Sequence, residues 1–198
     1  MKIHYYGAVM MMALGLGGLF PAVVAAQEPD KKEEPVKKED PAKLISPTAG
    51  YLEVWNDTGR KLIAMVEDFP EDKFDYRPMA GTRTFREAML HAAGTVYYFQ
   101  ALLNGQAPPE GDPKPEAYKT RVALVAYVKQ AIADGAAMIT KAGDGSFSKP
   151  MLLGARHKEN NPYSVWADLC EHTGEHYGQL VVYYRANGLV PPESRPKK

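Results

Sequence analysis

Residues 161–188, NPYSVWADLCEHTGEHYGQLVVYYRANG, predict a helix with two apolar faces. Asn161 and Pro162 are typical of a helix start, and Asn187-Gly188 is typical of a helix end. Apolar residues recur at helical spacing on one face (Val165, Leu169, Leu180, Tyr183) and on a second (Trp166, Cys170, Tyr177, Val181, Tyr184). Such a helix needs cover on both faces, either from the rest of a bundle or from another subunit.

Three further segments upstream show helical patterns. Residues 46–69 form the first, which ends before Pro70. The second, 84–103, begins with Thr84 and Glu87 at the spacing of a capping box and ends at Asn104-Gly105. The third runs over residues 116–141, after a proline-rich connection. No long alternating strand pattern appears, and residues 143–160 are interpreted as a long loop whose tail could hold a short irregular segment. The sequence therefore predicts an all-α four-helix bundle.

Composition narrows the class of protein. The chain has 198 residues, 45% hydrophobic, which excludes wholesale disorder. Its 24 basic residues balance 24 acidic ones, and this argues against nucleic-acid binding, which depends on excess positive charge. The single cysteine, Cys170, has no partner within the chain for a disulfide.

The first 44 residues differ from the rest. Residues 1–26 combine an early lysine, a long uncharged stretch and small residues at its end, which predicts a secretory signal peptide. A retained membrane anchor is the alternative. Residues 27–44 are rich in charge and proline and predict a flexible linker before a domain at 45–196. We therefore expect an exported protein, periplasmic or secreted, without a membrane span after cleavage.

Three histidines predict a metal site. His172 and His176 are four residues apart and share one helical face, on the apolar side of the last helix. His91 lies at the edge of the apolar face of the second helix and can supply a third ligand. The alternative is three hydrogen-bonded core histidines. Three nitrogen ligands would leave a position open on one divalent ion per chain, with zinc, nickel, iron and manganese all compatible.

Two motifs resemble those of the DinB-like (damage-inducible, YfiT-like) superfamily. These are GTRTFREAMLH at 81–91 and EHTGEHYGQL at 171–180, the latter followed by Tyr183, Asn187-Gly188, Pro191-Pro192 and Ser194-Arg195. The resemblance spans residues 45–196. It implies an antiparallel four-helix bundle with a long crossover connection, often a homodimer, and a metal site at the positions of His91, His172 and His176. Characterised relatives include thiol-dependent transferases and a maleylpyruvate isomerase, but their thiols are cytoplasmic, whereas this chain carries an export signal.

Two residues are predicted to bind substrate. Gln179 lies seven residues after His172, and Tyr98 lies seven after His91, so each is two helical turns from a histidine on the same face. No catalytic base is evident. Three functions stay open: a metal-dependent hydrolase or thiol transferase acting on an unknown small molecule, a non-catalytic exported protein that binds a metal or small ligand, and a structural bundle whose histidines satisfy one another.

Overall fold

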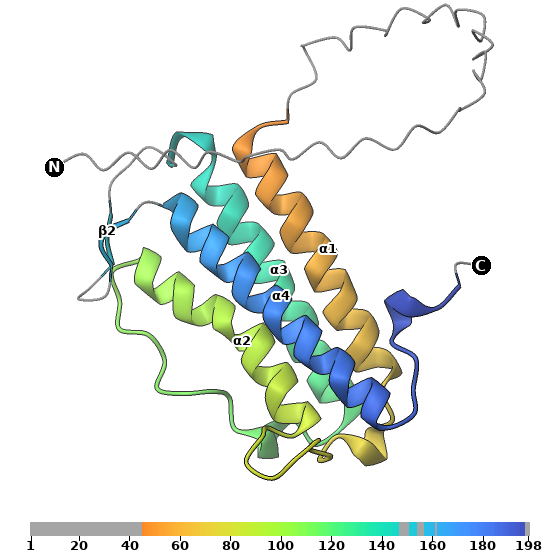
Figure 1. Cartoon of the computed structure of the whole chain (residues 1–198). Helices are drawn as coiled ribbons and strands as arrows, with labels where there is room; N and C mark the ends of the chain where they lie inside the picture. Colours follow the sequence, from red (N-terminus) through yellow and green to blue (C-terminus); the bar gives the residue numbers. More distant parts are fainter. Residues whose placement is uncertain (1–44, 147–150, 154–156, 161, 197–198) are drawn as a thin grey trace, which may run out of the picture. The chain divides into compact units, whose positions relative to one another are not determined.

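The computed structural model describes residues 45–146, 151–153, 157–160 and 162–196, and four helices dominate them (Figure 1). The predicted all-α four-helix bundle is confirmed. The helices are α1 (Pro47–Asp68), α2 (Phe85–Leu103), α3 (Arg121–Ala142) and α4 (Pro162–Ala186). Short 3-10 turns lie at Glu71–Lys73, Pro115–Tyr118, Asp144–Ser146 and Pro192–Ser194. The predicted signal peptide and linker, residues 1–44, and the predicted cap Asn161 lie outside the described residues.

Side-chain caps fix the starts of the first three helices. The Ser46 side chain accepts a hydrogen bond from the backbone N–H of Ala49. At α2 the predicted capping box is present, because Thr84 and Glu87 each bond to the other's backbone N–H. The prediction that the third helix starts at about residue 116 was wrong, because residues 115–118 form a separate 3-10 turn. Helix α3 starts after Thr120. This residue is the cap, because its backbone is extended and its side chain accepts a hydrogen bond from Ala123 N–H.

A small hairpin occupies part of the predicted loop at 143–160. Strands β1 (Met151–Leu153) and β2 (His157–Asn160) pair antiparallel, with Met151 opposite Asn160 and Leu153 opposite His157. The interpretation as loop was therefore wrong at 151–153 and 157–160, where the tail of the stretch holds paired strands in place of a short irregular segment. Strands of three and four residues are too short to produce the alternation that identifies a strand in a sequence.

The order of helices around the bundle differs from their order in the chain. Helix α1 packs against α3 and α4, and α2 packs against the same two helices. Consecutive helices α1 and α2 are thus diagonal, as are α3 and α4. Helices α1 and α4 run in one direction and α2 and α3 in the other (Figure 1), so the contacts α1–α3 and α2–α4 are antiparallel.

The parallel neighbours α2 and α3 require the long connection. Residues 104–120, called the crossover below, run from the end of α2 back along the bundle to the start of α3 (Figure 1). Helix α2 has 19 residues and is therefore about 28 Å long at 1.5 Å per residue. An extended chain as long as the crossover reaches roughly twice that distance, so the crossover has length to spare for a wall over α2.

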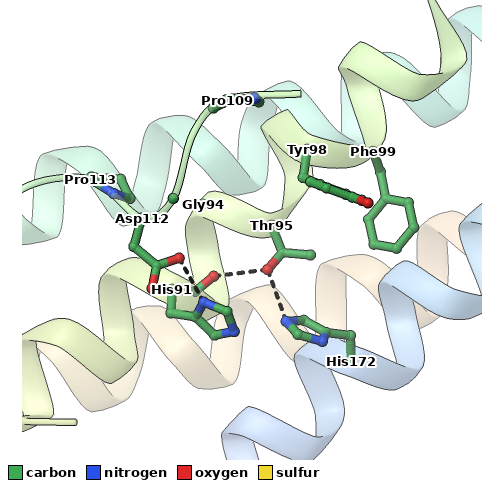
Figure 2. Close-up of a pocket in the computed structure, with 10 residues that line it drawn as sticks. His91, Gly94, Thr95, Tyr98, Phe99, Pro109, Asp112, Pro113 and His172 are labelled. Atoms are coloured by element: carbon green, nitrogen blue, oxygen red, sulfur yellow. Dashed lines mark hydrogen bonds and ion pairs between the residues drawn. The ribbon is translucent and has the colours of Figure 1, made fainter. Parts of the chain in front are cut away.

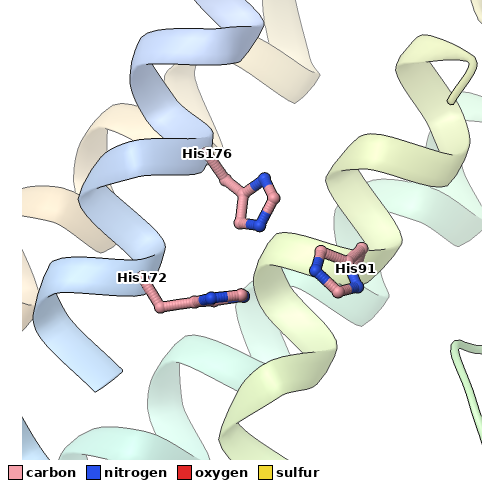
Figure 3. Close-up of side chains that lie close together, drawn as sticks. All are labelled: His91, His172 and His176. Atoms are coloured by element: carbon pink, nitrogen blue, oxygen red, sulfur yellow. The ribbon is translucent and has the colours of Figure 1, made fainter. Parts of the chain in front are cut away.

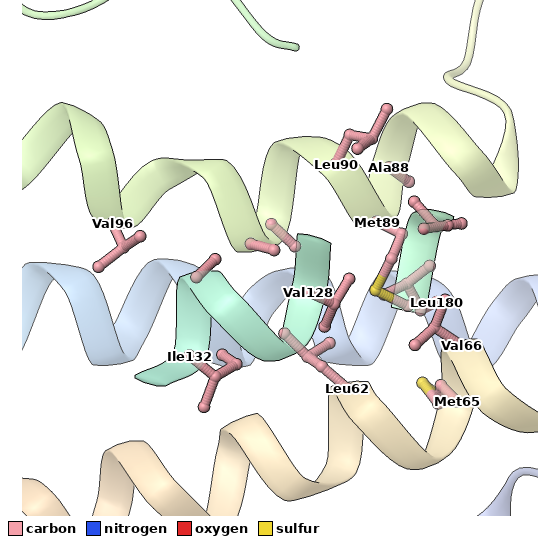
Figure 4. Packing of buried hydrophobic residues seen from close by; sticks show 14 of the residues in the cluster. Leu62, Met65, Val66, Ala88, Met89, Leu90, Val96, Val128, Ile132 and Leu180 are labelled. Atoms are coloured by element: carbon pink, nitrogen blue, oxygen red, sulfur yellow. The ribbon is translucent and has the colours of Figure 1, made fainter. Parts of the chain in front are cut away.

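The bundle encloses one continuous apolar core (Figure 4). Trp55 is fully buried, and its indole N–H donates to the Ile132 carbonyl oxygen at 2.8 Å, which ties α1 to α3. The Tyr184 hydroxyl, also buried, donates to the Met65 carbonyl oxygen at 2.8 Å and ties α4 to α1. Helix α3 is apolar enough by composition to cross a membrane, but its apolar stripe (Leu124, Val128, Ile132, Ile139) is buried in this core.

Candidate metal centre

The three predicted ligands converge between α2 and α4 (Figure 3). His172 and His176 project from successive turns of α4, and His91 faces them from α2. Ring centroids are 4.4 Å apart for His172 and His176, 4.6 Å for His91 and His176, and 5.2 Å for His91 and His172. One nitrogen from each ring lies within 4.8 Å of the others. The i, i+4 spacing on α4 and the antiparallel packing of α2 produce this convergence.

A carboxylate from the crossover holds His91. Asp112 Oδ1 lies 2.7 Å from His91 Nδ1, and Asp112 Oδ2 lies 3.3 Å from a guanidinium nitrogen of Arg83. The same Arg83 nitrogen is also 3.3 Å from His91 Nδ1. Because a guanidinium only donates and a carboxylate only accepts, Nδ1 cannot satisfy both. The shorter contact decides: His91 Nδ1–H donates to Asp112, and Nε2 keeps the lone pair.

Gln179 does the same for His176. Its side-chain oxygen lies 2.9 Å from His176 Nδ1. An amide oxygen accepts, so Nδ1 carries the proton and Nε2 is left as the nitrogen with a lone pair. Two of the three rings are therefore oriented through the nitrogen that does not face a metal, the usual arrangement for ligating histidines in metalloproteins.

Thr95 holds His172. Its hydroxyl oxygen is 2.9 Å from the His91 carbonyl oxygen and 2.9 Å from His172 Nε2. The hydroxyl has one proton. When it donates that proton to the carbonyl, its oxygen accepts from His172 Nε2–H, which leaves Nδ1 of His172 with the lone pair. Thr95 lies one turn after His91 on α2, so the same helix that carries one ligand positions another.

Burial keeps the α4 histidines neutral. Loss of solvent, together with the neighbouring rings of His176 and His91, lowers the pKa of His172 to about 4. Burial also lowers the pKa of His176, which is 6% exposed. Since a protonated imidazole cannot ligate a metal, these shifts leave both rings ready to bind near neutral pH.

The residues present fit a divalent ion on their donor chemistry. Two nitrogens on one ion lie at most about 4.2 Å apart at typical bond lengths, so small ring rotations bring the 4.8 Å cluster to ligating distance. Three imidazoles, each with its other nitrogen bonded to an oxygen, form a donor set suited to zinc, nickel or iron. Self-satisfied core histidines would instead have bonded to one another, and among the described residues no hydrogen bond joins two of these rings.

A cavity of about 370 Å³ opens beside the cluster (Figure 2). His91 and His172 line it together with Thr95 and Asp112. Its other walls are mostly apolar and come from α2 and from the crossover: Gly94, Tyr98, Phe99, Pro109 and Pro113. The cavity therefore gives a small molecule access to the histidines.

The two predicted substrate-binding residues occupy different places. Tyr98 lines the cavity and is 44% exposed. Gln179 does not line it; besides holding His176 it borders a second depression with Met79 and Val182. A substrate contact remains a prediction for both. Cys170 is half-buried, and burial raises the pKa of its thiol to about 11.

Sequence reasoning missed Asp112 and Thr95. Thr95 had a usable signal, since four residues separate it from His91 on the same helical face. Asp112 had none, because it lies in an irregular proline-rich stretch whose path depends on the fold. His157, assigned to the loop, lies in β2.

Comparison with known proteins identifies a superfamily and one similar fold. A sequence model of the DinB superfamily matches residues 55–180, which include all three histidines. No curated protein matches the chain. Among solved structures, YfiT from Bacillus subtilis matches with a TM-score of 0.55 at 17% sequence identity, over 78% of this chain and 97% of that chain. YfiT is described as "a probable metal-dependent hydrolase with an unusual four-helix bundle topology". At this identity the likeness shows a shared fold.

Proposed function

The chain belongs to the DinB superfamily, and on that premise we propose that it is a metal-dependent hydrolase of a small molecule. One divalent ion per chain would be held by His91, His172 and His176. The observation that carries the proposal is the convergence of three imidazole nitrogens within 4.8 Å at the wall of an open cavity. The description of YfiT as a probable metal-dependent hydrolase supports hydrolysis over thiol transfer.

The ion and the protein would divide the chemistry. When bound, a divalent ion supplies Lewis acidity, which polarises a carbonyl or phosphoryl oxygen and acidifies water. The chain's own residues bind and orient. Asp112 and Gln179 keep the Nδ1 protons of His91 and His176, so the opposite nitrogens stay free to ligate. The cavity admits the substrate beside His91 and His172.

The metal content of the purified protein tests the site. In protein prepared without a histidine tag, we expect elemental analysis to find about one divalent ion per chain. Replacing His91, His172 or His176 by alanine should each abolish stoichiometric metal. Cys170→Ala is the matched control, because it removes the only thiol, two residues from His172, and should retain the metal. Full metal content in His176→Ala would refute the site.

Activity decides between the two functions that the site supports. Metal-loaded protein is assayed against a panel of esters, amides and phosphoesters, with the His176→Ala variant as the blank. Hydrolysis that is lost with the metal supports the hydrolase. The alternative function, a protein that binds metal or a small ligand without turnover, is favoured because Asp112, the one carboxylate among the described residues that line the cavity, is already engaged by His91 and Arg83. Stoichiometric metal without turnover on any substrate class would favour it.

The metal's identity follows from the ligand set only in part. Three neutral nitrogens suit zinc, nickel and iron, and manganese less well. We propose a zinc ion, because zinc sites with three protein ligands and an open position are the common catalytic form. Metal analysis of protein expressed in medium with all four metals at equal concentration tests this, and a predominance of another metal would overturn it.

Export and pairing are further proposals that rest on the sequence. The signal-peptide pattern of residues 1–26 supports export, and N-terminal sequencing of protein from the cell exterior or periplasm should find a chain that starts near Gln27. The homodimer is a proposal that rests on the resemblance to the DinB superfamily, whose members often pair. Sedimentation equilibrium measures the dimer, and a monomer at high micromolar concentration would refute it.

A further inference from the structure

We infer that the cavity beside the histidines selects substrates carrying an uncharged, ring-sized apolar group, with the reacting bond next to that group. This inference rests on the proposed function and specifies its substrate class. The cavity would hold the apolar group while the histidine cluster faces the polar, reacting part. The argument comes from the cavity's size, its walls, its charges and the way the crossover is anchored.

The size of the cavity suits a ring. At about 370 Å³ it lies within the usual range for small-molecule sites. A cavity of roughly 150 Å³ is known to accept benzene, so the space here holds a six-membered ring together with the atoms that join it to the reacting group. His91 and His172 lie in the wall of the same cavity. A molecule of this size can therefore occupy the apolar part of the cavity and reach the histidines at the same time.

The walls away from the histidines are hydrocarbon. Tyr98 and Phe99 line one end, with ring centroids 5.6 Å apart at an interplanar angle of 87° (Figure 2). Pro109 and Pro113 of the crossover supply two further rings. Aromatic faces and prolines attract an apolar ring because both gain contact area as water leaves.

The cavity offers no unpaired charge to a substrate. Asp112 is the only acidic or basic residue in its lining apart from the histidines, within the part of the chain that the structure describes. One oxygen of that carboxylate accepts from His91 and the other pairs with Arg83. Away from the metal centre, a charged substrate group would therefore lose hydration against these walls without gaining a partner.

Gly94 explains how the crossover packs against α2 at Pro113. A side chain at this position would place its Cβ 3.4 Å from Pro113 Cδ and 2.8 Å from the Tyr127 hydroxyl oxygen. Glycine therefore lets the crossover pack directly on α2 one turn after His91. The same contact brings Asp112, the neighbour of Pro113, to His91, so the wall of the cavity and the carboxylate that orients the ligand are placed together.

Two metal-binding probes that differ only in their apolar group test the inference. Zinc-loaded full-length protein is titrated with acetohydroxamate and with benzohydroxamate by calorimetry. Both present the same chelating group, so the phenyl ring measures the cavity. We expect benzohydroxamate to bind about tenfold tighter or more. Tyr98→Ala should remove most of that advantage, and Phe99→Leu should reduce it. Tyr163→Ala is the matched control, since Tyr163 is similarly exposed (51% against 44% for Tyr98) and does not line the cavity.

The outcomes separate this inference from the proposed function. Equal affinity for the two hydroxamates overturns the apolar site while leaving the metal centre in place, and so does an advantage that persists undiminished in Tyr98→Ala. Protein that retains no divalent ion overturns the proposed function and this inference together, whereas metal-loaded protein that binds neither probe overturns this inference. Circular dichroism on each variant checks that the fold is kept.

Discussion

Replacing Asp112 by asparagine should weaken metal binding without unfolding the protein. The substitution keeps the shape of the side chain and an oxygen that accepts from His91 Nδ1–H, but it removes the negative charge. It also leaves the Arg83 guanidinium, 3.3 Å from His91 Nδ1, without its carboxylate partner. Both changes act on the ligand that faces α4, and neither touches the apolar core.

The size of the effect follows from the hydrogen bond that changes. A hydrogen bond to a charged group contributes about 1.5 to 3 kcal/mol and a neutral one about 1 kcal/mol. The loss is therefore about 0.5 to 2 kcal/mol, or roughly two- to thirtyfold in Kd. Measured effects of removing such supporting partners in metal sites are of the same order, about 10- to 100-fold.

Competition with a chromophoric zinc chelator measures the affinity of wild type and variant. Asp57→Asn is the control, because Asp57 is a carboxylate of similar exposure (48% against 40% of the side chain) that pairs with Arg60 and Lys61 far from the histidines. Its zinc affinity should equal that of the wild type. A Kd for Asp112→Asn within twofold of the wild-type value would refute the role assigned to Asp112.

Three further predictions concern stability. Gly135→Ala should destabilise the protein by at least about 2 kcal/mol, because the added Cβ would lie 2.4 Å from Trp55 Cζ2. Gly178→Ala should instead stabilise α4 by about 0.5 to 1 kcal/mol, because its Cβ would meet nothing within 4 Å. Urea unfolding measures both changes in stability, and the same sign for the two would contradict the packing. Tyr127→Phe should stabilise by about 1 kcal/mol, since the buried hydroxyl has no hydrogen-bond partner among the described residues, and a clear loss of stability by thermal unfolding would mean that the hydroxyl is bonded. The pKa of His172 is lowered to about 4, chiefly by burial. In metal-free protein the unfolded chain therefore takes up more protons than the folded chain between pH 6.5 and 4, and stability should fall by roughly 1 to 2 kcal/mol from pH 7 to pH 5. This fall should be smaller in His172→Gln.

The sequence predicted those parts of the fold that depend on local pattern. The four helices and the capping box at Thr84 have periodic or fixed-spacing signals, and the structure confirms them. The histidine cluster was predictable because His172 and His176 share a turn spacing and an apolar face, and His91 lies on a comparable face of another helix. Parts without a period were missed. The hairpin at 151–160 is too short for one, and the break before α3 depends on a single cap at Thr120.

The arrangement of the helices was beyond local pattern as well. Nothing in the periodicity of α1 and α2 says that they are diagonal rather than adjacent, and the long crossover was expected only from the resemblance to the superfamily. Asp112 could not be assigned for the same reason. Asp112 contacts His91 only because the crossover returns along α2, and sequence pattern does not predict that path.

Because of the crossover, the metal ligands and part of the wall that faces a ligand lie on different segments of this bundle, which a bundle with tight turns does not allow. The three histidines sit on rigid, packed helices, where most substitutions would disturb the core. Part of the wall that faces a ligand lies instead on the crossover, which has spare length and little helical packing to preserve. Insertions, deletions or new side chains at residues 104–111 are therefore tolerable mutations that remodel what the cavity admits while leaving the ligating rings untouched. For protein engineering, this makes the crossover the segment to randomise in a search for new substrates, with Asp112 and Pro113 held constant as its anchor.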